Sequence, residues 1–286
     1  MVLLRRFNVK IPAVVVFYNP SEENINNLKV YEKSVDKIYV VDNSDDEVIR
    51  LKNTKKIEYI KLFTNKGIAS ALNEGAKKAI EDGYGWLLTL DQDSQITSDV
   101  IEKLKKYLME HDTSKIGLVS PYQDINAKEE LKDVEAEEML EVMTSGNIIN
   151  LKAWQEIGGF KDWLFIDCVD TEYCMNLNEH GFKVLRLNKV WMTHHLGNLV
   201  EHKFLGKIYP CYNHSPIRRY YIMRNNLYIN EMYKDKYPLY CKHLLRIQKG
   251  QVKRILLFEP DKYRKLKMMY KGYRDFKKKI KGKYEE

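Results

Sequence analysis

The 286-residue sequence holds only four cysteines, and they form neither a CxxC pair nor a cysteine–histidine spacing of the kind that binds zinc. Such scattered thiols exclude a disulfide-built fold and predict reduced cysteines in a cytosolic protein. No apolar run is long enough to cross a bilayer. The first residues place a short apolar stretch before the positive charge, which is the reverse of a secretory signal.

The sequence also lacks internal repeats and any linker rich in glycine and serine. With 44% hydrophobic residues it can bury a substantial core, which predicts one large domain or one domain with a helical appendage. Residues 241–286 carry 16 Lys and Arg against 5 Asp and Glu, a net charge of +11. The rest of the chain carries 32 against 35, a net charge of −3. A basic tail on a slightly acidic body favours an anionic partner for the tail.

Apolar residues recur at roughly helical spacing among the bases of residues 241–283. Basic amphipathic helices of this kind are typical of segments that lie on an anionic membrane surface. The alternative is a helical hairpin that packs its apolar side on the rest of the chain or on a second subunit. A nucleic-acid-binding protein would also have a basic surface, but the sequence contains no recognised module of that class.

The body alternates apolar runs of strand length with segments of helical periodicity, a pattern typical of an α/β layered domain with a largely parallel sheet. Residues 123–141 are acidic and predict a surface excursion without a strand. The predicted strands cover residues 11–18, 37–44, 57–62, 86–90, 116–120 and 189–192. The predicted helices cover residues 22–34, 67–82, 98–111 and the chain after 216, with breaks at 237–238 and 259–260.

The predicted strand at residues 86–90 leads directly into two carboxylates one residue apart, Asp91 and Asp93. Ligand sites in open α/β sheets lie at the carboxyl ends of strands. Two carboxylates held together there repel each other unless a positive group joins them. A divalent cation that also binds a substrate phosphate meets this requirement, whereas a simple turn is the structural alternative.

Further motifs surround this pair in a fixed order along the chain. They are Val40–Ser44, Asn65–Gly75, Asp91–Ser94, Ser145–Asn147, Gly158–Phe160, Phe165–Glu172 and Tyr220–Asn225. Together they resemble glycosyltransferase family 2, and within it the rhamnosyltransferase-like subgroup, over about residues 11–230. The resemblance implies the GT-A fold, a Rossmann-like, mixed, mostly parallel sheet flanked by helices, followed here by a basic C-terminal helical extension.

The resemblance also implies a division of the chain. The catalytic domain would cover residues 1–230, with a nucleotide-binding half over about residues 1–120 and an acceptor half over about 121–230. Residues 231–286 would form the basic extension.

By the same resemblance, a nucleotide-sugar donor binds with a divalent cation, Mn²⁺ or Mg²⁺, that stabilises the leaving diphosphate. Asp93 would bind the metal and Asp91 the ribose. Either His194 or His195 could complete the metal site, and His195 is preferred because Leu and Gly follow it. The other residues assigned to the nucleotide and donor are Tyr18, Asn19, Asp42, Asn65, Lys66, Gly67 and Arg224.

Several of these residues have a structural alternative. Asp42 and Asn65 could cap a turn or a helix. Arg224, like its neighbours Arg218 and Arg219, could either bind the diphosphate or belong to an ion-paired helix face.

An inverting transfer needs a base that takes the proton from the acceptor hydroxyl. The family places an aspartate at the start of an acidic run, which corresponds here to Asp170, with Glu172 as the second acid. Val169 stands where many members have glutamate, a departure common in the rhamnosyltransferase-like subgroup. Asp167 is the competing base, and all three acids could simply begin a helix. The remaining acceptor-side residues are Trp154, Gly159, Phe160 and Trp163.

The sequence therefore predicts an inverting glycosyltransferase that moves rhamnose from dTDP-L-rhamnose to a glycan or lipid-linked acceptor in surface polysaccharide synthesis. A UDP-hexose or UDP-N-acetylhexosamine transferase of the same fold is the first alternative. A catalytically silent assembly subunit is another, although it would be expected to lack Asp93 or Asp170. We expect a cytoplasmic protein at the inner face of the cell membrane, without nucleic-acid binding, and a homo-oligomer would be compatible with the tail.

Overall fold

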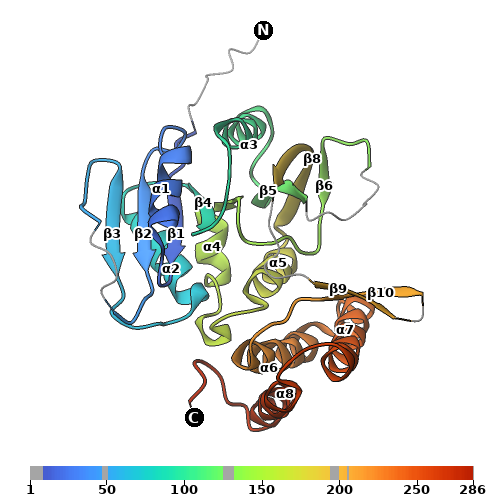
Figure 1. The fold of residues 1–286 in the computed structure, drawn as a ribbon. Helices are drawn as coiled ribbons and strands as arrows, with labels where there is room; N and C mark the ends of the chain where they lie inside the picture. Colours follow the sequence, from blue (N-terminus) through green and yellow to red (C-terminus); the bar gives the residue numbers. More distant parts are fainter. Residues whose placement is uncertain (1–8, 47–50, 125–131, 194–199, 205, 286) are drawn as a thin grey trace. The chain divides into compact units, whose positions relative to one another are not determined.

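The computed structural model describes residues 9–46, 51–124, 132–193, 200–204 and 206–285 (Figure 1). The chain divides into two compact units. Unit 1 comprises residues 1–162 and 170–194, and unit 2 comprises residues 163–169 and 195–286. The division differs from the predicted boundary at residue 230, which lies inside a helix of unit 2.

Eight strands build unit 1: β1 (Ala13–Phe17), β2 (Ile38–Asp42), β3 (Ile57–Lys61), β4 (Trp86–Asp91), β5 (Ile116–Asp124), β6 (Ala136–Glu138), β7 (Asn147–Asn150) and β8 (Lys183–Thr193). They form one sheet in the order β3-β2-β1-β4-β7-β5-β8-β6. The first four strands of this order are parallel neighbours, and β5 is parallel to β8. β7 runs antiparallel to both of its neighbours, and β6 runs antiparallel to β8. The mixed, mostly parallel sheet confirms the predicted fold class.

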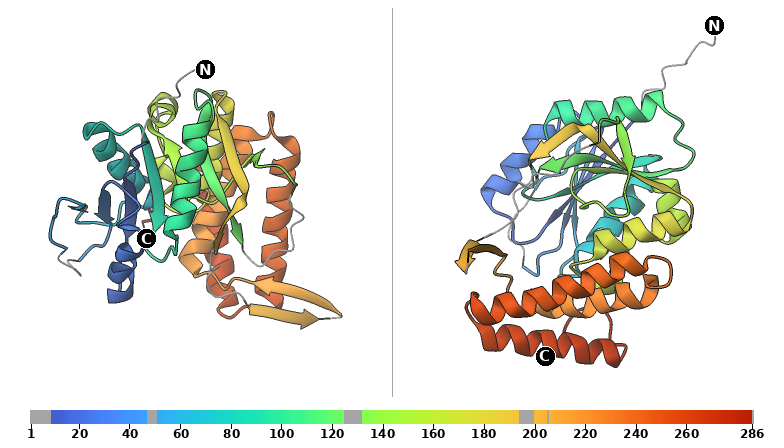
Figure 2. Two further views of the ribbon diagram at one scale, coloured as in Figure 1. Left: turned by 90° about the horizontal axis from the view of Figure 1, so that it is seen from above. Right: turned by 90° about the vertical axis from the view of Figure 1, so that its right-hand side faces the viewer.

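Helices cover both faces of this sheet (Figure 2). α1 (Glu22–Tyr31) and α3 (Ser98–Glu110) share one hydrophobic core with Ala13, Val15 and Phe17 of β1. Side chains alternate along a strand, so Val14 points to the opposite face, where α2 (Ile68–Glu81) packs. A Cβ atom added at Gly75 of α2 would lie 2.2 Å from Val14 Cγ2. Glycine at this position is therefore what allows the helix to approach the strand so closely.

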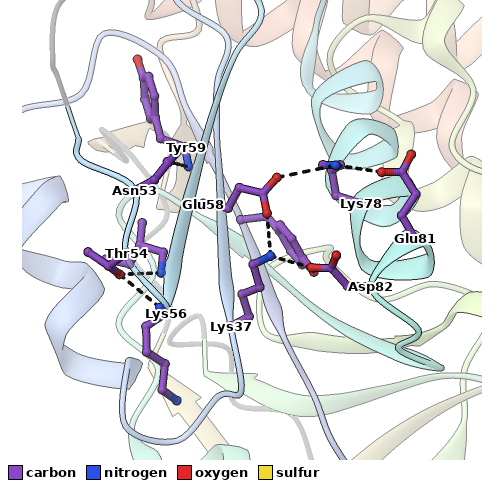
Figure 3. Close-up of polar contacts among 11 residues, drawn as sticks. Lys37, Asn53, Thr54, Lys56, Glu58, Tyr59, Lys78, Glu81 and Asp82 are labelled. Carbon is purple, nitrogen blue, oxygen red and sulfur yellow. Dashed lines mark hydrogen bonds and ion pairs between the residues drawn. The ribbon is translucent and has the colours of Figure 1, made fainter.

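An ion-pair network joins the beginning of β2 and β3 to the end of α2 (Figure 3). Lys37 Nζ lies 2.5 Å from carboxylate oxygens of Glu58 and Asp82, and the Tyr39 hydroxyl donates a hydrogen bond to Asp82. The hydrogen bonds from Lys37 and Tyr39 hold the pKa of Asp82 below its ordinary value. The network lies at the amino ends of the two strands, and their carboxyl ends are left for the candidate site.

The structure contains elements that the sequence did not predict. β6 lies inside residues 123–141, where no strand was expected, and it pairs with β8 at the edge of the sheet. A three-residue edge strand with two glutamates has no apolar alternation to reveal it. β8 is also much longer than residues 189–192. β7 and α4 (Leu151–Ile157), which Asn150 caps, were absent from the prediction.

The described residues of unit 2 after position 199 form a hairpin and three helices. β9 (Val200–Phe204) and β10 (Lys207–Cys211) pair antiparallel, and α6 (Pro216–Tyr233), α7 (Pro238–Leu257) and α8 (Lys262–Lys277) follow. The helices end where the predicted breaks lie, and α7 has its proline in the first turn. α6 packs along α8 so closely that a Cβ at Gly272 would lie 2.5 Å from the Tyr220 carbonyl oxygen. Within the described ranges, no helix combines the length and apolar character needed to cross a bilayer.

A buried ion network holds these helices together. Glu259, after α7, accepts hydrogen bonds from Arg219 Nη2 of α6 at 2.6 Å and from Lys265 Nζ of α8 at 2.8 Å. The side chains of all three residues are at most 4% exposed. Glu259 therefore links all three helices of unit 2 through groups that are removed from water.

Candidate functional site

The carboxyl ends of four parallel strands meet at one edge of the sheet in unit 1. Phe17 of β1 stands opposite Asp42 of β2, and Asp42 stands opposite Lys61 of β3. Val16 of β1 stands opposite Asp91, the last residue of β4. This register places Asp42 and Asp91 on the two sides of β1, at the edge where open α/β sheets bind their ligands.

Asp42 is completely buried, and both of its carboxylate oxygens accept hydrogen bonds. The Ser44 backbone N–H donates to Oδ1 at 2.9 Å, while the Tyr59 hydroxyl and Lys61 Nζ donate to Oδ2 at 2.5 and 3.1 Å. Burial alone would raise the pKa of Asp42, but the hydrogen bonds from Ser44, Tyr59 and Lys61 outweigh it and lower the pKa. Asp42 is therefore a stable anion that ties β2 to β3.

The second predicted donor segment folds directly against the loop that follows β2. Asn43 Oδ1 accepts from the Lys66 backbone N–H at 2.8 Å, and Asp45 Oδ1 accepts from the Asn65 backbone N–H at 3.0 Å. Asn65 Oδ1 in turn accepts from the Gly67 N–H at 3.0 Å. Gly67 has a φ of 86° at the entrance to α2, a conformation that favours glycine. The structure thus brings Asn65, Lys66 and Gly67 together with the end of β2.

The end of β1 connects the other two strand ends. The Tyr18 backbone N–H donates to Gln92 Oε1 at 2.9 Å, and the Asn19 N–H donates to Ser44 Oγ at 2.8 Å. The Tyr18 side chain is 45% exposed. Loops from β1, β2 and β4 are therefore hydrogen-bonded into one rim.

Hydrogen bonds from neighbouring residues fix the turn that carries Asp91 and Asp93. The Ser94 N–H donates to the Asp91 carbonyl at 3.1 Å, and the Asp91 N–H donates to Ser94 Oγ at 3.0 Å. Asn27 of α1 donates from its amide to the carbonyls of Gln92 and Ser94. With the backbone held in this way, Asp93 is exposed and Asp91 half-buried.

The two carboxylates have the donor chemistry that Mn²⁺ and Mg²⁺ accept. His194 and His195, the candidates for the other protein ligand, lie outside the described residues. Among the residues that are described, no group of three or more His, Cys, Asp or Glu side chains is arranged to hold a metal ion. Asp91 and Asp93 therefore have the chemistry to hold such an ion, and its binding there stays a prediction.

Asp170 stands in the first turn of α5 (Val169–Glu179), where the helix dipole favours a carboxylate. Its Oδ1 accepts from the Thr171 backbone N–H at 2.9 Å. Asp170 lines a narrow pocket of unit 1 together with Thr89, which lies two residues before Asp91 on β4. Cys174 lines the same pocket, but burial raises the pKa of its thiol so far that it is no candidate nucleophile. Within unit 1, Asp170 is thus the carboxylate that the fold brings beside β4.

Glu172 and Asp167 are in different surroundings. Glu172 is completely buried in α5. Asp167 belongs to unit 2, where the guanidinium of Arg218 binds both carboxylate oxygens, with Nε 3.3 Å from Oδ2. Arg218 therefore occupies both carboxylate oxygens of Asp167, whereas Asp170 lines the pocket beside Thr89. The choice between the two acids as the base stays a prediction.

Arg224, which was assigned to the diphosphate, is completely buried in α6 of unit 2. Its Nε donates to Asn225, Nη1 donates to the Tyr220 hydroxyl and the Gly282 carbonyl, and Nη2 donates to the carbonyls of Trp163 and Leu164. These contacts use all five N–H groups of the guanidinium. The described contacts therefore give Arg224 a structural role in unit 2.

The predicted acceptor-side residues of unit 1 pack around Asn73 of α2, which the sequence analysis did not single out. Asn73 Oδ1 accepts from Trp154 Nε1 at 3.1 Å and from the Phe160 N–H at 3.0 Å. The Phe160 ring stacks on Tyr173 with 4.1 Å between centroids. A Cβ at Gly159 would lie 2.8 Å from the Trp154 ring. A polar residue on the buried face of a predicted helix was the signal that could have identified Asn73.

Trp163, the remaining aromatic residue of the predicted acceptor side, belongs to unit 2. Its ring lies edge-on to Tyr228, with 5.0 Å between centroids, and Lys281 Nζ lies 4.3 Å from its centroid. Its place as an acceptor residue stays a prediction.

Comparison with known proteins identifies the family. The family model described as glycosyl transferase family 2 matches residues 13–160. The dTDP-rhamnosyl transferase RfbF of Shigella flexneri is 32% identical over 237 residues, which cover 76% of this chain and 79% of RfbF.

Two solved structures share the fold. S. aureus TarS 1–349 gives a TM-score of 0.53 at 16% identity, covering 95% of this chain and 81% of that one. GalNAc-T7, crystallised with UDP, GalNAc and Mn²⁺, gives a TM-score of 0.57 at 14% identity, covering 95% and 57%. These likenesses confirm the predicted GT-A fold. With a family match over half of its length and a relative at 32% identity, the chain belongs to glycosyl transferase family 2 and is a glycosyltransferase.

Proposed function

We propose that the protein is an inverting rhamnosyltransferase that moves L-rhamnose from dTDP-L-rhamnose to a glycan or lipid-linked acceptor in surface polysaccharide synthesis. The observation that carries the proposal is the common edge of the sheet, where the register of β1, β2 and β4 brings Asp42 and Asp91 to the two sides of the end of β1. The identity with a relative named as a dTDP-rhamnosyl transferase supports rhamnose rather than a UDP-hexose as the donor sugar.

In the proposed reaction, the acceptor hydroxyl attacks the anomeric carbon while the bond from that carbon to the diphosphate oxygen breaks. Asp170, in the first turn of α5 where the helix dipole favours a carboxylate, accepts the hydroxyl proton. Asp91 would hold the ribose, and Asp93 would hold a divalent cation. A bound Mn²⁺ or Mg²⁺ supplies positive charge beside the diphosphate, where negative charge grows as the bond breaks.

The rim formed by the loops after β1 and β2 holds the nucleotide in this proposal. Tyr18 and Asn19 border the base, and the buried Asp42 holds the end of β2 in place for it. Asn65 and Gly67 shape the entrance to α2. The backbone N–H groups of Asn65 and Lys66 bind the loop after β2, and the exposed Lys66 side chain is left to meet a phosphate.

A donor panel tests this function. With Mn²⁺ present, the purified protein is expected to consume dTDP-L-rhamnose faster than UDP-glucose, UDP-galactose or UDP-N-acetylglucosamine. At about 100 times its Kd, dTDP is expected to stabilise the protein by about 2.7 kcal/mol in a thermal-shift assay with Mn²⁺. Asp93→Asn should remove the dependence on Mn²⁺, while Asp99→Asn, an exposed acid on α3, should keep it.

Three other outcomes would speak against the proposal. If no nucleotide stabilises the protein in a metal-dependent way, the proposed donor and metal site is wrong. If the protein prefers a UDP-sugar, that UDP-sugar is the donor and dTDP-L-rhamnose is not. Tight nucleotide binding without transfer to any acceptor would favour the silent assembly subunit.

We also propose that α7 holds the enzyme at an anionic membrane surface. The helix contains five Lys and Arg residues and no Asp or Glu. Its exposed positions at helical spacing are Leu239, Lys242, Arg246, Lys249, Lys253, Leu256 and Leu257. Its buried positions, Cys241, Gln248 and Ile255, lie on the opposite side. The outward face of α7 is therefore basic with apolar ends, as expected of a helix at a lipid interface.

Neutralising four cations of α7 should remove this binding. Each basic residue near an anionic membrane contributes about 1 kcal/mol, so changing Lys242, Arg246, Lys249 and Lys253 to Gln is expected to weaken liposome binding by about 10³-fold. Co-sedimentation with vesicles containing phosphatidylserine measures the effect. Four exposed lysines of unit 1 changed in the same way form the control, namely Lys77, Lys103, Lys106 and Lys189.

Unchanged sedimentation of the α7 variant would contradict the membrane role. If the variant instead changes its oligomeric size, α7 is a contact between subunits. Deleting the tail is a less informative test because Lys265 of α8 and the residues around Glu259 hold unit 2 together.

A further inference from the structure

The segment Trp163–Cys168 leads directly into α5 and has an unusual backbone. Phe165, Asp167 and Cys168 have φ values of 68°, 64° and 63°, in the left-handed region that favours glycine. Residues with a Cβ atom are strained in this region and remain there only when the surrounding structure holds them. Such a segment keeps its shape only if strong contacts compensate for the strain.

Two adjacent residues of α6 supply these contacts to the backbone. The amide nitrogen of Asn225 donates to the carbonyls of Leu164, Ile166 and Asp167 at 2.8–2.9 Å. Arg224 Nη2 donates to the carbonyls of Trp163 and Leu164 at 3.2 Å each. Arg224 Nε also donates to Asn225 Oδ1 at 3.0 Å, which fixes the orientation of the Asn225 amide. Both side chains are 0% exposed, so no water competes for these carbonyls.

Other residues of α6 hold the side chains of the segment. The Phe165 ring stacks on Tyr221 with 5.1 Å between centroids. Asp167 pairs with Arg218, and Cys168 Sγ donates to Asn226 Oδ1 at 3.1 Å. The end of the chain joins the arrangement, because the Gly282 N–H donates to the Trp163 carbonyl at 2.9 Å and the Gly282 carbonyl accepts from Arg224. All of these contacts lie within unit 2.

We propose that Arg224 and Asn225 are positioning residues for sugar transfer. They hold Trp163–Cys168 in its strained conformation, and this segment is joined through Val169 alone to Asp170. The inference rests on the proposed function, in which Asp170 is the base. We call Arg224 and Asn225 together the clamp. Without it, the left-handed residues would relax and the first turn of α5 would lose its fixed direction. An error of about 1 Å in the placement of a reacting group can cost about 10²-fold in rate.

Asn225→Asp is the variant that tests the clamp, since it keeps the size of the side chain and the acceptor for Arg224 Nε. It replaces the donating amide nitrogen with an oxygen that repels the three carbonyls. We expect kcat to fall about 10²-fold, while the donor KM and the thermal shift with dTDP stay within about twofold, because the donor site of unit 1 is untouched. Asn230→Asp on the same helix is the matched control and should behave like the wild type.

Hydrogen exchange provides a readout that does not depend on activity. Amides of residues 165–171 should exchange at least about tenfold faster in Asn225→Asp than in the wild type, while those of β1 and β4 stay unchanged. If Asn225→Asp does not fold, a chain that ends at residue 280 is the second variant to test. It removes the Gly282 contacts and should show the same pattern with a smaller loss of kcat.

The clamp is overturned if folded Asn225→Asp keeps kcat within about threefold of the wild type, or if exchange at residues 165–171 is unchanged. A parallel loss of kcat and nucleotide binding would also overturn it, since it would show general damage. If Asp170→Asn remains active, the base assignment fails instead, and the exchange result still decides whether Asn225 holds the segment.

Discussion

Asp170→Asn is expected to lower the rate of sugar transfer by about 10²- to 10⁴-fold, which is the usual contribution of a general base. Asparagine has the shape of aspartate and can keep the hydrogen bond from the Thr171 backbone N–H, but it cannot accept the acceptor proton. Nucleotide binding should change by no more than about twofold, because Asp42, Asp91 and Asp93 stay in place. Steady-state kinetics with the preferred donor and a thermal shift with dTDP measure the two effects separately.

Asp162→Asn is a suitable control for this variant. Asp162 also belongs to unit 1, and it accepts a hydrogen bond from Asn73, which asparagine can still accept. Asp167→Asn tests the competing base and should lose about tenfold or less, through the loosened segment rather than through proton transfer. Near-wild-type turnover of Asp170→Asn together with an inactive Asp167→Asn would move the base to Asp167.

Glu259→Gln is expected to lower the free energy of unfolding of unit 2 by about 3–5 kcal/mol. The change leaves the buried cations Arg219 and Lys265 without the anion between them. Urea unfolding followed by hydrogen exchange in α6–α8 would measure the loss. Glu231→Gln is the control, since its pair with Lys279 is largely exposed and contributes at most about 1 kcal/mol.

The same network predicts a dependence on pH. Burial alone would raise the pKa of Glu259, but the hydrogen bonds and charges of Lys265 and Arg219 outweigh it and lower the pKa. A carboxyl whose pKa is lowered by folding stabilises the fold above its unfolded pKa of about 4.3 and loses that contribution as the pH falls through the folded value. The wild type should lose stability in this acidic range more steeply than Glu259→Gln. Parallel pH profiles would contradict the role given to Glu259.

The parts of the fold with a clear apolar period could be predicted from the sequence. β1, β2 and β4 are buried on both faces, so they read as continuous apolar runs, and their ends marked Asp42 and Asp91 correctly as strand-end residues. β6 could not be predicted, because an edge strand of Ala and two Glu residues depends on its neighbour rather than on its own composition.

The residues of the candidate site could likewise be predicted only in part. The order of motifs along the chain was sufficient to predict the family, but a motif does not show where a side chain points. Arg224 illustrates this, because a guanidinium suits phosphates and backbone carbonyls equally well, and only the folded chain shows five N–H groups already in use. The left-handed backbone of Phe165 and Cys168 was equally invisible, since neither residue is a usual choice for that conformation.

The order of the two units along the chain limits how this protein could exchange parts with its relatives. Unit 2 draws residues 163–169 from the middle of the sequence and the rest from the end, so the chain crosses between the units three times. A recombination event that transplanted only the region after residue 195 would pair α6 with the recipient's own segment in place of residues 163–168, whose side chains bind Arg218, Tyr221 and Asn226 here. The helices of unit 2 are therefore expected to transfer intact only together with residues 163–169.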